Sequence, residues 1–141
     1  MTDEIILEAE DVWYSYEDDG SFALRGLDVR IKKGSRVAFV GANGSGKSTF
    51  FLCCNGILRP QKGTIRFHGK PLRYTKKALI SLRAKVGIVF QDPDNQLFSA
   101  SVRQEISFGI LNLGAGETEA AEAVDRVMEE MEITPFQDQP V

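Results

Sequence analysis

Residues 41–49 combine three glycines with a lysine and three hydroxyl side chains, in an order that can bind phosphate. They match the pattern G-x-x-x-x-G-K-[ST], known as Walker A. Glycines let the backbone curl so that its N–H groups surround phosphate oxygens, and a helix starting at the loop adds its free amides and its dipole. We expect Lys47 to contact the β and γ phosphates of a nucleotide and the Ser48 hydroxyl to coordinate Mg²⁺. The predicted nucleotide-binding residues are Gly41, Ala42, Asn43, Gly44, Ser45, Gly46, Lys47, Ser48 and Thr49.

The segments on either side of this loop are those that a phosphate site requires. Residues 37–40 (Val-Ala-Phe-Val) form an apolar run, which predicts a strand buried on both faces of a parallel sheet. Residues 48–54 are predicted to form a helix directly after the loop. A glycine-rich turn that contains Lys and Ser by coincidence would not have this context. The context therefore favours nucleotide binding over a simple turn.

Periodicity and turn residues predict the remaining elements of the first 90 residues. Segments 5–16 and 23–31 mix alternation with β-branched and aromatic residues, and are predicted to pair in a small antiparallel sheet. Residues 63–67 predict a short strand, and residues 76–83 a short helix. Residues 86–90 predict a second fully apolar strand. Strands that alternate with helices around a glycine-rich loop indicate an α/β fold.

The C-terminal third of the chain is predicted to be helical. Ser101 and Gln104 have the spacing of a capping box, so a helix is expected from Val102. One face of a later helix is apolar, which favours packing against the domain core over a ligand surface. That face consists of Ala120, Val124, Val127, Met128 and Met131. Thr134-Pro135 predicts a further helix start, with Thr as the cap and Pro at the first position.

Composition and charge narrow the classes of protein. The chain has 141 residues, a net charge of -3 and 43% hydrophobic residues, which fits one soluble domain and argues against a nucleic-acid-binding protein. Its acidic start and the lack of a long apolar run predict a cytoplasmic location. The adjacent Cys53 and Cys54 are expected to be buried free thiols, and His68 to lie in a surface turn.

The segment from Glu8 to Thr49 resembles the opening of the ATPase domains of ABC transporters. In that family an aromatic side chain stacks on adenine, and the match falls on Tyr16, 31 positions before Lys47. An ordinary outer-sheet aromatic is the alternative for Tyr16. Residues 89–93 (Val-Phe-Gln-Asp-Pro) resemble the family's Q-loop, whose glutamine reaches the Mg²⁺ and the attacking water. The resemblance implies that Gln91 joins Lys47 as a catalytic residue and Ser48 as a metal ligand, with ATP and Mg²⁺ bound.

Longer phrases resemble the energy-coupling-factor importers, and most of all the ATP-binding subunit of cobalt importers. They lie at residues 55–60, 87–98, 107–109 and 112–113, and the likeness covers essentially the whole chain. It implies a P-loop ATPase core with an N-terminal antiparallel β subdomain, driving uptake of cobalt, a related metal ion or a vitamin. It also implies a transmembrane transport subunit and a second ATPase subunit as partners, no nucleic acid, and a peripheral position on the cytoplasmic face of the membrane. Residues 92–101 are the candidate docking surface.

Three motifs of the family do not occur in these 141 residues: the Leu-Ser-Gly-Gly-Gln signature, a Walker B strand ending in Asp-Glu, and the later switch histidine. Asp125 and Glu129-Glu130 fall in a helical pattern and are not assigned the Walker B role. The chain is expected to be the N-terminal part of one ATPase domain, truncated before the signature. Its ATP-binding core would cover about residues 1–90, and the Q-loop with the start of a helical subdomain about residues 91–141. We expect nucleotide binding without turnover.

Two alternatives remain open at this stage. A non-catalytic, shortened nucleotide-binding module would keep the phosphate loop and act as a sensor or competitor. A P-loop kinase or GTPase would need a base-specificity motif or a lid, neither of which is found, and it leaves the matches at Tyr16 and Gln91 unexplained.

Overall fold

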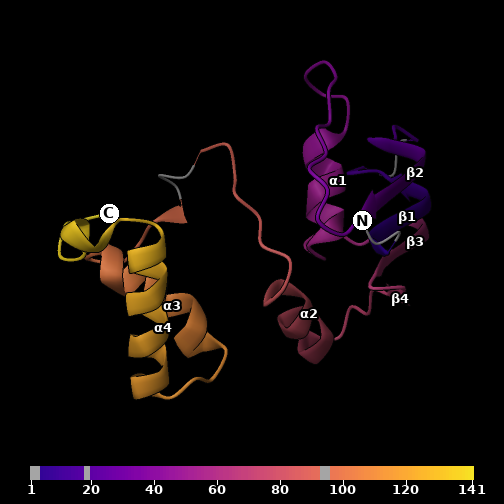
Figure 1. The fold of residues 1–141 in the computed structure, drawn as a ribbon. Coiled ribbons are helices and arrows are strands. Elements are labelled where there is room, and N and C mark those ends of the chain that lie inside the picture. The colour runs from indigo at the N-terminus through magenta and orange to yellow at the C-terminus, as the bar shows by residue number, and fades with distance from the viewer. Residues whose placement is uncertain (1–3, 18–19, 93–95) are drawn as a thin grey trace. The chain divides into compact units, whose positions relative to one another are not determined.

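Strand β1 (Ile5–Tyr14) lies inside a four-stranded antiparallel sheet with the order β2-β1-β3-β4. Its neighbours are β2 (Leu24–Lys32) and β3 (Lys62–Phe67), and the two-residue β4 (Lys70–Pro71) pairs with β3. The computed structural model that shows this describes residues 4–17, 20–92 and 96–141 (Figure 1). The predicted strands at 5–16, 23–31 and 63–67 are confirmed within two residues, and so is the predicted antiparallel pairing of the first two.

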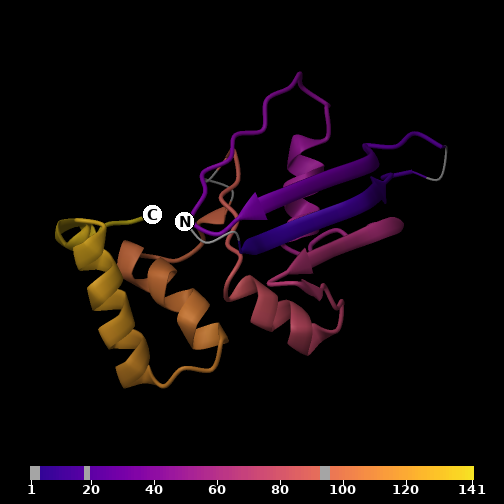
Figure 2. The same cartoon turned by 45° about the vertical axis from the view of Figure 1, so that its right-hand side comes forward.

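Helix α1 (Lys47–Cys54) lies along one face of this sheet, as Figures 1 and 2 both show. The core between them is apolar: Leu7, Ala9, Val12, Leu24 and Ile65 come from the sheet, and Phe50, Cys53 and Cys54 from the helix. In β1 the inward alternation of Leu7 and Ala9 shifts by one residue at Asp11, which has φ 47° beside a register shift. This bulge turns Val12 inward in place of residue 11. The helix predicted at 48–54 is confirmed, and so are the buried free thiols.

Helix α2 (Lys76–Arg83) has the predicted bounds and begins at a side-chain cap. The Thr75 hydroxyl accepts a hydrogen bond from the Ala78 amide. At its other end, the Arg83 guanidinium donates to the Gly56 carbonyl at 3.1 Å, and Leu82 is buried. These contacts connect α2 to the turn that follows α1.

The predicted buried strands at 37–40 and 86–90 are wrong for this chain. Neither segment is in a strand, and the side chains of Val40 and Val89 are 95% and 93% exposed. A buried parallel strand needs neighbouring strands and a cover on both faces. Among the described residues the strands β1 to β4 form the sheet and none of them pairs with either run. Phe39 alone of residues 37–40 is partly buried, against Phe50 and Phe51.

The second part of the chain contains α3 (Val102–Asn112), α4 (Glu117–Glu130) and the 3-10 helix η2 (Thr134–Phe136). Helix α3 starts at Val102 as predicted, with the Ser101 hydroxyl accepting from the Gln104 amide at 3.4 Å. Helices α3 and α4 lie side by side in Figures 1 and 2 and contact each other.

Two details of the predicted C-terminal helices are wrong. Ala120, Val124 and Met128 of α4 are buried, but Val127 is 39% and Met131 67% exposed, so the buried face is narrower than predicted. Val127 lies one position from the buried row, and Met131 follows the end of α4. Ile133, and not Thr134, is the residue that precedes η2 as its cap, so Thr134 already lies inside the short helix.

The chain divides into two compact units, Met1–Ile88 and Val89–Val141. The first contains the sheet, α1, α2 and residues 41–49. The second contains Gln91 and helices α3 and α4. This division falls two residues before the boundary predicted at about residue 90.

Candidate nucleotide-binding site

The loop before α1 is shaped by glycines in left-handed backbone conformations. Gly44 has φ 81° and Gly46 has φ 88°, a region that residues with side chains rarely adopt. The Ser45 amide donates to the Ala42 carbonyl at 3.2 Å, which closes a turn within the loop. The loop then leads directly into α1, which begins at Lys47. A glycine-rich loop that opens a helix in this way presents backbone amides to an anion.

Gly46 also lies against the sheet. A Cβ atom at this position would stand 2.4 Å from the Ala23 carbonyl oxygen and 3.0 Å from the Leu24 side chain. The first distance is shorter than real Cβ contacts, and it is to a backbone atom; the second is a tight contact that would need the Leu24 side chain to shift. The absence of a side chain at Gly46 therefore lets the loop meet the start of β2, which positions the loop relative to the sheet.

The ammonium group of Lys47 lies within this loop. Its Nζ donates to the carbonyl oxygens of Gly41 at 2.7 Å and Ala42 at 2.8 Å, and to the Ser45 hydroxyl at 3.2 Å. A lysine ammonium has three donors, and all three are used here. The positive charge is thus held over the loop, where an anion bound by the loop amides would meet it.

The N-terminus of α1 is open to a ligand. Gly46 is its cap residue and offers no side-chain hydrogen bond, and the first turn contains no acidic residue. The amides and the dipole at this end therefore favour an anion. Ser48 is exposed in the first turn, whereas Thr49 is buried.

Tyr16 lies next to this helix start. Its hydroxyl is 3.1 Å from the Thr49 hydroxyl, and its ring meets the Tyr14 ring edge-on at a centroid distance of 5.0 Å. The residue is nevertheless 62% exposed. An open hollow of about 340 Å³ adjoins it, lined by Tyr16, Glu17, Ser21, Phe22 and Ala23. The structure thus brings Tyr16 and residues 41–49 together within one unit, with an aromatic ring open to solvent beside the loop.

Gln61 positions the segment that carries Tyr16, and no sequence pattern indicates this role. Its side-chain oxygen accepts from the Ser15 amide at 2.6 Å, and its side-chain nitrogen donates to the Ser15 carbonyl at 3.2 Å. The two bonds pin the backbone one residue before Tyr16. A single polar residue between a helix and a strand carries no periodicity or motif, so only the folded chain reveals it.

Gln91 belongs to the second unit, Val89–Val141, and not to the unit that contains the loop. It is exposed and lines an open hollow of about 350 Å³ with Phe90, Asp92 and Gln96. The Gln96 side chain donates to the Asp92 carbonyl at 3.3 Å. Residues 93–95, which are part of the predicted Q-loop and docking surface, lie outside the described residues.

The donor set near the loop fits a nucleotide-bound metal ion better than a metal held by protein alone. No group of three or more His, Cys, Asp or Glu side chains gathers within residues 4–17, 20–92 and 96–141. Ser48 offers an exposed hydroxyl at the start of the helix. Residues 29–91 contain no Asp or Glu, so this stretch provides no carboxylate beside it. Mg²⁺ is commonly bound by few protein oxygens together with substrate phosphates, and this arrangement suits that mode.

Comparison with known proteins agrees with this geometry. The model of the ABC transporter family matches residues 24–141. The energy-coupling factor transporter ATP-binding protein EcfA3 of Clostridium perfringens is 46% identical over 138 residues, which is 98% of this chain and 48% of that protein. The corresponding protein EcfA of Methanocaldococcus jannaschii is 42% identical over 135 residues, 96% of this chain and 48% of that protein.

A solved structure supports the same assignment. The structure of cbiO1 from Clostridium perfringens, described as part of the ABC transporter complex cbiONQ, has a TM-score of 0.85 and 47% identity. The match covers 97% of this chain and 54% of that one. This chain therefore spans about half the length of the relatives it matches. In its described part, no helix is long and apolar enough to cross a membrane. The family match over residues 24–141 and the phosphate-loop fold together show that the chain belongs to the ABC transporter ATPase family.

Proposed function

We propose that this chain is the ATP-binding part of an energy-coupling-factor importer ATPase, in which ATP binding and hydrolysis drive solute uptake. The observation that carries the proposal is the loop at residues 41–49, where Lys47 holds its charge over the carbonyl oxygens of Gly41 and Ala42 at the uncapped start of α1. The names of the relatives, which are ATP-binding proteins of energy-coupling factor transporters, support it.

Phosphate binding would use the loop as it stands. The loop amides and the α1 amides would donate to phosphate oxygens, and Lys47 would exchange its carbonyl partners for the β and γ phosphates. The stretch from residue 29 to residue 91 has no carboxylate to oppose this, so its charge favours a polyanion. The predicted roles of residues 41–49 rest on this geometry.

Adenine would stack on Tyr16. Its ring is exposed, while its hydroxyl is fixed to Thr49 in the first turn of α1. A ring fixed at its edge leaves a face free, and stacking on an aromatic face tolerates any orientation of the base's hydrogen-bonding groups. The Gln61 bonds to Ser15 hold this arrangement in place.

Side chains of this chain would hold a nucleotide-bound Mg²⁺ at the phosphate loop. Ser48 is the proposed protein ligand at the helix start, and Gln91 is the proposed second ligand. When bound, the ion neutralises charge on the phosphates during phosphoryl transfer. Lys47 would stabilise the same charge, and Gln91 would orient the attacking water.

Turnover by these 141 residues alone is not expected. They include no Asp-Glu after an apolar strand and no signature sequence, so the water-activating carboxylate is missing from this chain's own residues. We therefore propose that the chain binds ATP, and that hydrolysis belongs to a protein with the length of its relatives.

The proposed partners are a transmembrane transport subunit and a second ATPase subunit. Residues 92–101 are the proposed docking surface, in which Phe98 is 64% exposed and meets Phe108 edge-on at 4.6 Å. The Glu105 carboxylate accepts from the amides of Phe98 at 3.3 Å and Ser99 at 2.9 Å, which gives this end of the segment a fixed shape. Cobalt is one candidate solute, because of the likeness to cbiO1, with nickel or a vitamin as alternatives.

Calorimetric titration with Mg·ATP tests the proposal, with phosphate release followed in the same samples. We expect binding by the wild-type chain, none by Lys47→Ala, unchanged binding by Lys62→Ala, and no release of phosphate. Melting curves of the three proteins show whether each is folded. Absence of binding by a folded wild-type chain would sink the proposal.

The same titration addresses the second candidate function, a non-catalytic nucleotide-binding module. This alternative also predicts binding without turnover, and the described loop favours it equally. The two hypotheses predict different results when the chain is mixed with a full-length energy-coupling-factor ATPase and its membrane partner. A module that competes would lower their ATPase activity in a Lys47-dependent manner, whereas part of a transporter ATPase would leave it unchanged.

A further inference from the structure

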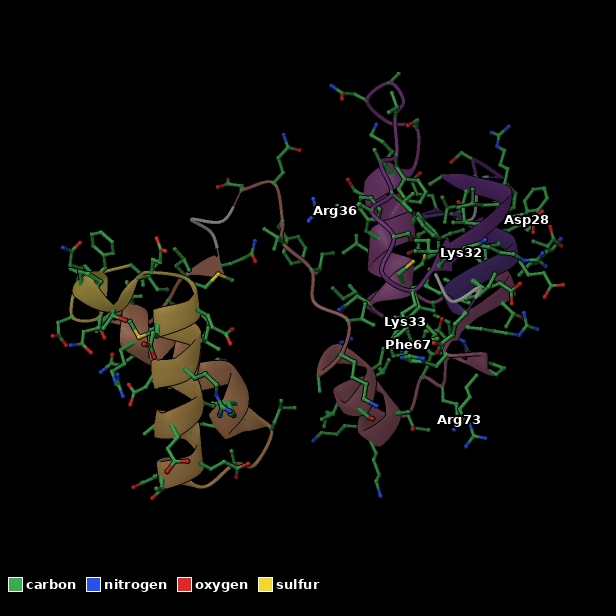
Figure 3. The ribbon with its side chains drawn as sticks, viewed as in Figure 1. Asp28, Lys32, Lys33, Arg36, Phe67 and Arg73 are labelled. Carbon is green, nitrogen blue, oxygen red and sulfur yellow. The ribbon has the colours of Figure 1, made fainter. Side chains whose placement is uncertain are left out.

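A groove of about 540 Å³ lies beside α2 in the first unit, and no residue of the phosphate loop lines it. Its apolar wall comes from β3, β4 and α2, with Leu82 buried and Phe67 and Leu72 partly buried. Lys70, Arg73 and Lys85 line it as well, and all three are exposed. Figure 3 shows Phe67 beside α2 and Arg73 on the segment between β4 and α2. We call this feature the α2 groove.

The charge around the α2 groove is one-sided. Residues 29–91 contain every Lys and Arg of the chain except Arg25, Arg103 and Arg126, which is 14 of 17, and no Asp or Glu. A sequence of this length without a carboxylate cannot neutralise its own cations. The net charge of -3 conceals this, because the 20 acidic residues all lie before or after the stretch.

The cations of the groove are also unpaired within the part of the chain that the structure describes. No described carboxylate forms an ion pair with Lys70, Arg73 or Lys85. Glu4, which lies beside His68 next to β3, is already shared between Lys33 at 3.2 Å and His68 at 3.4 Å. A ligand with negative charge would therefore meet three free cations.

We propose that the α2 groove binds an acidic, amphipathic segment of a partner protein. The groove volume and apolar wall suit inserted aliphatic or aromatic side chains, as in helix-in-groove recognition. Its cationic edge selects Asp and Glu around them and repels basic segments. An anionic membrane surface offers the charge but has no side chain to fill a hollow, so the shape favours a peptide. The proposal does not depend on nucleotide binding.

The test uses an array of amphipathic peptides, each about 15 residues long, enough for an apolar stripe of four turns. One set combines the apolar stripe with Glu and Asp, a second replaces the acids with Lys, and a third keeps the acidic composition but scatters the apolar residues. We expect the fluorescently labelled chain to bind members of the first set only. The triple variant Lys70→Glu, Arg73→Glu, Lys85→Glu is expected to lose at least about ten-fold in affinity.

A matched variant separates the groove from net charge. Lys62→Glu, Lys76→Glu, Lys77→Glu changes the net charge by the same amount on residues that do not line the groove, and it should keep binding. Ser81→Trp fills the groove without changing the net charge, and it should abolish peptide binding. Circular dichroism melting of each variant checks its folding.

Four outcomes would overturn the proposal. In the first, no peptide of the first set binds the wild type more tightly than the groove variant. In the second, both triple variants lose the same peptide affinity. In the third, folded Ser81→Trp binds the peptides as tightly as the wild type. The fourth is a wild-type chain that binds phosphatidylserine vesicles, or a second copy of itself in sedimentation, through the groove residues in place of any peptide.

Discussion

The hydroxyl of Tyr16 lies 3.1 Å from the hydroxyl of Thr49, so the proposed adenine-stacking residue is tied to the first turn of α1. These residues are 33 positions apart, and the link joins the two regions expected to hold the base and the phosphates. Because the hydrogen bond uses the edge of the ring, a base can stack on its face while the bond persists. The ring face can therefore stack on a base while the hydroxyl keeps its hydrogen bond to Thr49.

Replacing Tyr16 tests these two roles of the side chain. Tyr16→Ala is expected to raise the Kd for ATP about ten-fold or more, because base–aromatic stacking contributes about 1–3 kcal/mol. Tyr16→Phe keeps the ring and should change the Kd by less than about three-fold, the scale of one exposed hydrogen bond. Tripolyphosphate provides the control, since it has no base and should bind wild type and Tyr16→Ala equally. Equal weakening of ATP and tripolyphosphate would show that Tyr16 acts on the loop and not on the base.

Gly46 and Gly44 form a matched pair for the loop's fit to the sheet. Both have positive φ, so alanine costs each about 1–2 kcal/mol of backbone strain. At Gly46 the new Cβ would also collide with the Ala23 carbonyl, whereas at Gly44 no heavy atom lies within 4 Å of it. Gly46→Ala is therefore expected to lower the free energy of unfolding by more than Gly44→Ala in urea titrations. Equal losses would mean that the loop does not rest on β2.

The buried thiols predict a decline in stability at alkaline pH. Burial raises the pKa of Cys53 to about 11 and that of Cys54 to about 12. An unfolded thiol has a pKa near 8.5, so above this pH the unfolded state gives up protons that the folded state keeps. The free energy of unfolding should thus fall as pH rises from about 8.5 towards 11.

The double variant Cys53→Ala, Cys54→Ala is the control for this pH dependence. It should show a smaller slope over the same range, although it also loses packing at every pH. Reaction with a thiol reagent at pH 8 offers an independent readout, and should be fast only after denaturation. Rapid reaction of the folded chain would contradict the burial.

Local sequence was enough to predict the elements whose cause is local. The alternation in residues 5–16, 23–31 and 63–67 predicts strands that the structure contains, and Ser101 predicts the start of α3. The loop at 41–49 could be identified because its function requires a particular spacing of glycines and lysine. Each of these features depends on residues close together in the chain.

Features that depend on distant residues could not be predicted. Gln61 pins the Ser15 backbone from 46 residues away, and neither residue carries a motif. Residues 37–40 show the opposite kind of error, a predicted feature that the structure lacks. Their apolar composition predicts burial, but burial requires neighbouring strands. An apolar segment can pack in a core, but whether it is buried depends on the elements that pack against it.

Threonine replacements measure this difference directly. Val and Thr have similar shapes, so Val→Thr mainly adds a hydroxyl. At Val40, which is 95% exposed, the free energy of unfolding should change by less than about 0.5 kcal/mol. At Val12, which is fully buried, the hydroxyl loses water without gaining a partner, and the cost should be about 1–3 kcal/mol. Urea denaturation of both variants decides the matter. If Val40→Thr cost as much as Val12→Thr, residues 37–40 would be buried in solution, as their composition alone predicts.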